Sequence, residues 1–104
     1  MMGYVDDSIA LFNKNARSIF SEYAASYQEK EALYLKGTHF LRIRVLNSLV
    51  EMLQQQLKSE MDYTLTECKK TAPDEYPVVK QKLVLSYEKY VSCFRNLNFE
   101  IDNS

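Results

Sequence analysis

The chain has 104 residues, which is the size of one domain. Hydrophobic residues make up 46% of it and charged residues 26%, as in an ordinary globular protein. Basic and acidic residues number 4 and 5 in 1–37, 5 and 4 in 38–72, and 4 and 5 in 73–104. This balance argues against the basic face of a nucleic-acid-binding protein and against an anionic membrane surface as partner.

The composition favours an all-α fold. Two glycines and two prolines are too few for a β fold, whose turns depend on those residues. No apolar run approaches the ~18 residues of a transmembrane helix, so we predict no membrane span.

The first helix is expected over residues 5–36. Apolar residues recur there at steps of three and four, a pattern that is strong at its start and weak after Tyr23. Nothing interrupts the segment before Gly37. The predicted stripe consists of Ile9, Phe12, Ala16, Ile19, Tyr23, Ser26, Lys30 and Leu33.

The second helix is expected over residues 38–70. Its two C-terminal lysines, Lys69 and Lys70, are favoured at that end by the helix dipole. Pro73 then stops the helix, because the residue before a proline is disfavoured in helical geometry. The predicted stripe consists of Leu46, Val50, Leu53, Leu57, Met61, Leu65 and Cys68.

The third helix is expected over residues 76–97, with Pro77 well tolerated in its first turn. Its apolar face is wide, as in a helix packed against two others. One row consists of Val79, Leu83, Ser86, Tyr90, Cys93 and Leu97, and Val84, Tyr87, Val91 and Phe94 lie beside it. The tail 98–104 loses the pattern and is expected to fray.

Gly37 separates the first two helices, and two interpretations of it stay open. Glycine is the preferred left-handed residue just after a helix, and Thr38 is an acceptable N-cap for the next one. This favours a turn and an antiparallel hairpin. An isolated glycine is also tolerated within a helix, so one continuous helix is the alternative.

The helix lengths predict an extended three-helix bundle, a single domain over 1–104. Arms of 32 and 33 residues would each span roughly 50 Å, whereas the third helix would span only ~30 Å. The end of the hairpin nearest Gly37 is therefore left without a third helix. It is also the most apolar part of the chain. We predict partner binding there by Tyr34, Phe40, Leu41, Arg42, Ile43, Arg44, Val45 and Leu46.

Arg42 and Arg44 alternate with large apolar residues, which has two interpretations. Arginine beside aromatic residues is typical of protein interfaces, where both are enriched. Arginines also lie along ordinary helix flanks with their stems packed and their charged groups in water.

No motif for catalysis, metal or cofactor binding is present. His39 is the only histidine, and its sequence neighbours supply no partner for a metal site or a general base. We therefore expect no enzyme activity and no cofactor. Cys68 and Cys93 have neither the number nor the spacing of a disulfide framework, so reduced thiols and a cytoplasmic or nuclear location are expected.

Function is expected to rest on association. The sequence predicts a non-enzymatic subunit or adaptor of an intracellular complex that binds partner helices through the apolar end of the hairpin. Homodimerisation and assembly with another protein both remain open. The alternatives are a small nucleic-acid-associated module, which the charge balance makes unlikely, and a helical enzyme of unknown chemistry.

Overall fold

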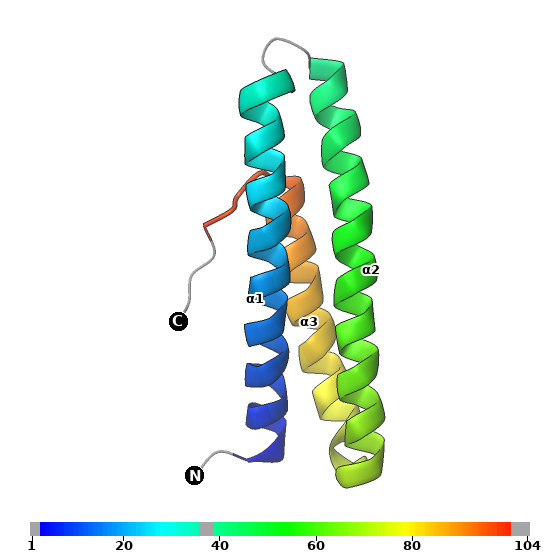
Figure 1. The fold of residues 1–104 in the computed structure, drawn as a ribbon. Coiled ribbons are helices and arrows are strands. Elements are labelled where there is room, and N and C mark those ends of the chain that lie inside the picture. The colour runs from blue at the N-terminus through cyan, green and yellow to red at the C-terminus, as the bar shows by residue number, and fades with distance from the viewer. Residues whose placement is uncertain (1–2, 36–38, 101–104) are drawn as a thin grey trace.

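The computed structural model describes residues 3–35 and 39–100, and these form a three-helix bundle (Figure 1). Helix α1 spans Tyr4–Lys30 and continues as a π-helical turn, Glu31–Leu35. Helix α2 spans His39–Thr71, and after a 3₁₀ turn at Pro73–Glu75 helix α3 spans Tyr76–Arg95. The expected all-α fold with two long helices and a shorter third is confirmed.

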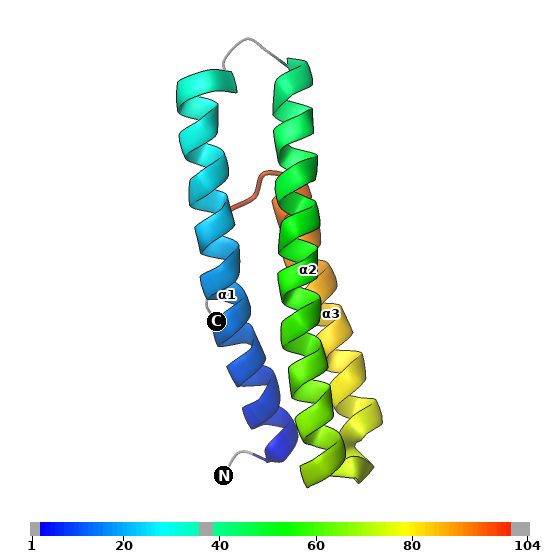
Figure 2. The same ribbon diagram turned by 45° about the vertical axis from the view of Figure 1, so that its right-hand side comes forward.

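Helices α1 and α2 are antiparallel. Asn15 donates to Glu60 at 3.4 Å, and Glu31 forms an ion pair with Arg42, so positions later in α1 meet positions earlier in α2. Both ribbon views show the same arrangement (Figures 1 and 2). The alternative of one continuous helix is therefore wrong. The conformation expected of Gly37 lies outside the described residues.

Beyond Ala16 the buried residues of α1 follow a row beside the predicted one, whose Ile19 and Tyr23 are partly buried and pack against the core. Phe20 is buried, and its ring lies 5.9 Å from Tyr90 and 5.6 Å from Phe94, centroid to centroid. The predicted row ran instead through Ser26 and Lys30. The large ring of Phe20 packs between α1 and α3. The buried residues of α1 are Phe12, Ala16, Phe20, Ala24 and Tyr27.

The predicted rows of α2 and α3 largely coincide with the core. The α2 residues in it are Leu49, Val50, Leu53, Leu57 and Cys68. The α3 residues are Val79, Leu83, Tyr90, Val91 and Phe94. Each of the three helices contacts both others, as expected from the wide apolar faces of α2 and α3.

Helix α3 ends in a Schellman motif, two residues earlier than expected. The Asn98 N–H donates to the Cys93 carbonyl at 2.8 Å, and the Leu97 N–H donates to the Phe94 carbonyl at 3.0 Å. Leu97 has a φ of 58°, the left-handed conformation that glycine usually supplies at this position. The motif turns the chain away from the axis of α3 towards α1 (Figure 2).

The expected fraying of the tail is wrong at Phe99. This ring is partly buried, with centroid distances of 6.2 Å to Phe20, 5.7 Å to Tyr27 and 5.1 Å to Phe94. Edge-on and tilted aromatic pairs at such distances add to the stability gained from burial. The tail therefore covers the core where α3 stops. Residues 101–104 lie outside the described part.

The molecule is elongated, as the helix lengths predicted. Its principal extents are 52 × 23 × 16 Å, and its radius of gyration is 15.7 Å, against about 13 Å for a compact domain of 100 residues. Helices α1 and α2 continue past the end of α3 (Figure 1). We call this two-helix part the hairpin end: residues 28–35 of α1 and its π-helical turn, with residues 39–48 of α2.

Candidate protein-binding site

The hairpin end exposes several large apolar side chains. Phe40 is 70% exposed, Leu33 64%, Ile43 44% and Leu41 43%. Scattered single hydrophobic residues are normal on a protein surface, but several large ones within a few turns mark a candidate interface. This is the part of the molecule where the sequence predicted partner binding.

The remaining predicted apolar residues are placed differently. Val45 and Leu46 are partly buried and pack against the core, so they support the hairpin and offer little free surface. Tyr34 belongs to the π-helical turn, and its side chain lies outside the described part.

Arg42 connects the two arms of the hairpin. Its Nη2 lies 3.4 Å from Oε2 of Glu31, and both side chains remain 39% exposed. The Tyr27 hydroxyl and then the Glu31 carboxylate favour the charged guanidinium and raise the pKa of Arg42 above its usual value. Arg42 therefore has a structural contact within the chain in addition to any contact with a partner.

Arg44 lies over the ring of Phe40, with its guanidinium carbon 5.8 Å from the ring centroid. The two residues are four positions apart, so they are neighbours on one helix face. Such a cation–π contact contributes about 0.5–1 kcal/mol at an exposed site. Phe40 and Arg44 thus form one amphipathic unit on the outside of α2.

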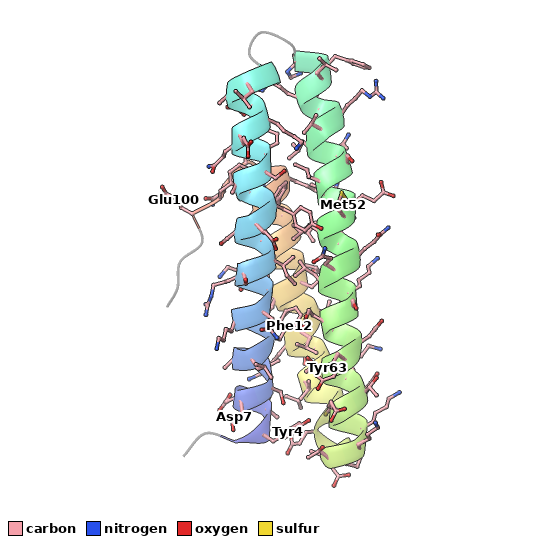
Figure 3. All side chains as sticks on the ribbon, viewed as in Figure 1. Tyr4, Asp7, Phe12, Met52, Tyr63 and Glu100 are labelled. Atoms are coloured by element: carbon pink, nitrogen blue, oxygen red, sulfur yellow. The ribbon has the colours of Figure 1, made fainter. Side chains whose placement is uncertain are left out.

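The exposed apolar residues of α2 lie on two different faces. Eleven residues make three helical turns, so positions eleven apart share a face. By this spacing Leu41 shares its face with Met52 and Tyr63, which are 46% and 63% exposed. Met52 and Tyr63 are labelled in Figure 3.

Ile43 shares a face with Gln54, which lines a surface hollow together with α3 residues. The sequence-predicted anchors therefore do not form one surface. Ile43 lies on the side of α2 against which α3 packs further from the hairpin end. Leu41 lies on a different side.

A hollow of about 220 Å³ lies at the hairpin end, just beyond α3. Both arms of the hairpin and the C-terminal tail contribute to it. Its lining residues are Tyr27, His39, Arg42, Ile43, Leu46 and Leu97. The sequence pattern did not indicate Tyr27 or Leu97 as part of the site, because the first was assigned to no stripe and the second was assigned to the core row of α3.

A wider hollow of about 560 Å³ runs along the outside of α3 near Leu85. All its lining residues come from this single helix: Tyr76, Pro77, Lys80, Gln81, Val84, Leu85 and Glu88. It is the surface of one helix, with no second element to oppose it.

Within residues 3–35 and 39–100, no three His, Cys, Asp or Glu side chains are grouped as a metal would require. The two thiols are free: Cys68 is buried and donates to the Ala72 carbonyl at 3.4 Å, and Cys93 is partly buried. No helix of the described part has the length and hydropathy to cross a membrane.

Comparison with family models, curated proteins and solved structures gave no match for this chain. Function is therefore inferred from the geometry of the molecule alone.

Proposed function

We propose that the protein is a non-enzymatic helical subunit or adaptor, which binds partner helices through the hairpin end. The observation that supports this is the exposure of Leu33, Phe40, Leu41 and Ile43, at 43–70%, where α1 and α2 extend past α3. A protein interface typically has large apolar and aromatic residues at its centre with arginine among them. Phe40 and Arg44 already form such a pair.

The proposed setting is an intracellular complex in the cytoplasm or nucleus. The free Cys68 and Cys93 support a reducing compartment, since disulfides are the rule in small domains of oxidising ones. The partner helices belong either to another protein or to a second copy of this chain.

Phe40→Ala tests the proposal. Hot-spot residues each contribute roughly 2 kcal/mol or more to binding, so this variant should lose most of its partner when the tagged chain is recovered from cell extract. Leu85→Ala is the matched control, because Leu85 is 62% exposed on α3, away from the hairpin end. It should recover the partner as the wild type does.

Circular dichroism melting of the same proteins separates binding from folding. Phe40 is largely exposed, so Phe40→Ala should melt close to the wild type. Equal recovery by Phe40→Ala and Leu85→Ala would contradict the proposal. Loss of the fold in step with loss of the partner would show that the hairpin end serves the monomer's own stability.

A further inference from the structure

The geometry points to a specific occupant of the hairpin end: a short amphipathic helix of another protein, bearing a carboxylate, that lies in the groove between α1 and α2 as a collinear continuation of α3. This inference rests on the proposed function and adds which face is used and which chemistry is recognised.

Away from the hairpin end, the groove between α1 and α2 is already occupied by α3. Lys58 lies 6.0 Å from the ring centroid of Tyr87, and Lys69 lies 4.9 Å from that of Tyr76, which marks the side of α2 that faces α3. Phe40 precedes Lys58 by eighteen residues, which is five helical turns. Phe40 therefore lies at the outer edge of the face that α3 covers, since Lys58 is itself exposed.

Ile43 belongs to the same side of α2. It precedes Gln54 by three turns, and Gln54 and Tyr87 line one hollow at the α2–α3 contact. In the lower part of the groove this side is covered by α3, and at the hairpin end Ile43 remains 44% exposed. The uncovered surface is thus continuous with an established helix-binding surface.

The space defines the length of the occupant. Helix α2 has 33 residues and α3 has 20. The thirteen extra residues correspond to roughly 20 Å, or between three and four turns of helix. The lower limit of this space is set by the tail, where Leu97 lines the hollow and Phe99 closes the core beneath it.

The lining defines the chemistry. Ile43, Leu46 and Leu97 make an apolar floor, and Arg42 and His39 add polar groups at its side. A guanidinium carries five N–H donors, and the Arg42 side chain, still 39% exposed, uses only part of them on Glu31 and on the Tyr27 hydroxyl. Donors therefore remain for a carboxylate on the incoming helix.

A second copy of this chain fits less well. The exposed apolar residues of α3, Val78 and Leu85, are its best helix face for such a role. Lys82 and Lys89 flank that face on one side and Glu88 flanks it on the other, so docking it here would bring two cations and one carboxylate towards Arg42. Like charges at an interface disfavour the pairing.

The test uses a phage-displayed library of helices about fourteen residues long, matched to the uncovered groove. Their apolar positions are fixed, and their flanking positions allow Glu, Lys or Gln. Clones selected on the full chain should be enriched in Glu over Lys. They should bind Leu41→Asp like the wild type and bind Ile43→Asp more than about tenfold more weakly, as expected at a hot spot.

Leu41 and Ile43 are matched controls because they are 43% and 44% exposed and lie within one turn of α2. If Ile43→Asp alters the dichroism melt, Ile43→Ala is compared with Leu41→Ala instead. Arg42→Gln should remove the preference for Glu, whereas Lys80→Gln, at an exposed position near the start of α3 and remote from the hairpin end, should keep it.

Each of the other possible results of these binding experiments would reject a specific part of the inference. Equal damage by Leu41→Asp and Ile43→Asp would leave the proposed function standing and reject the collinear position. Damage by neither, or no enriched clone, would reject both. Enrichment in Lys would reject the carboxylate. Self-association of the chain in sedimentation, abolished by Ile43→Asp, would make a second copy the occupant and reject a foreign helix.

Discussion

Leu97 ends α3 in a backbone conformation that leucine rarely adopts. Its φ of 58° is the only positive value for a non-glycine residue in the described part of the chain. An L-residue pays roughly 1–2 kcal/mol for this conformation. Strain of this kind persists where the surroundings enforce it. Here the Schellman hydrogen bonds and the packing of Phe99 do so, and Leu97 reaches the hollow at the hairpin end.

Two substitutions at Leu97 distinguish the effect of the backbone strain on stability from the effect of the side chain. Leu97→Ala keeps the strain and removes the side chain, whereas Leu97→Gly removes both. We expect the glycine variant to be the more stable by about 1 kcal/mol in urea denaturation. Equal stability of the two would mean that the left-handed conformation is not adopted in solution.

Helix α1 shows how rotation of one element decides which residues meet the core. Ala24 is 5% exposed, whereas the neighbouring Ala25 is exposed. The sequence pattern placed the stripe through Tyr23 and Ser26, one step to the side of the row that the core uses. The residue actually in the core there is small, which lets the helices approach closely around the Phe20 ring.

Substituting each alanine by leucine tests this rotation. Ala24→Leu should destabilise the protein by about 1–3 kcal/mol, because a large side chain overpacks a close helix contact. Ala25→Leu should change stability by less than about 0.5 kcal/mol, as surface substitutions usually do. Thermal melts of both variants provide the measurement. The reverse order would place Ala25 in the core and would mean that α1 is rotated differently.

At the scale of the whole molecule, packing changes along the long axis. The lower part has three helices around one core, and the hairpin end has two. Regions with few buried contacts open locally at lower free energy than the core. The hairpin end should therefore be the less protected end of the bundle.

Amide hydrogen exchange tests this difference in protection between two segments of α2. Residues 45–48 and 62–65 are equally far from the two ends of the helix, so end fraying affects them alike. We expect the amides of 45–48 to exchange faster, because α3 covers only the other segment. A selected helical peptide should slow exchange at 45–48 only. Equal exchange rates of the two segments in the free protein would contradict the lower protection of the hairpin end.

The sequence by itself determined the helices and their approximate ends. These features depend on local chemistry: the spacing of apolar residues, the scarcity of glycine and the helix-stopping effect of Pro73. The mismatch in length follows from the helix ends alone, so the exposed hairpin end was predictable too. Phe40 and Ile43 were identified for the same reason.

Only the tertiary structure decided how the elements are rotated against one another. The burial of Phe20 and Tyr27 depends on where α3 and the tail lie, and Phe99 looks like part of a patternless tail until its aromatic neighbours are assembled. Leu41 and Ile43 lie on different faces of α2 because of their spacing alone, but only the tertiary structure decided that the Ile43 side is the one that faces α3. Local sequence sets helix formation, whereas these contacts join residues far apart in the chain.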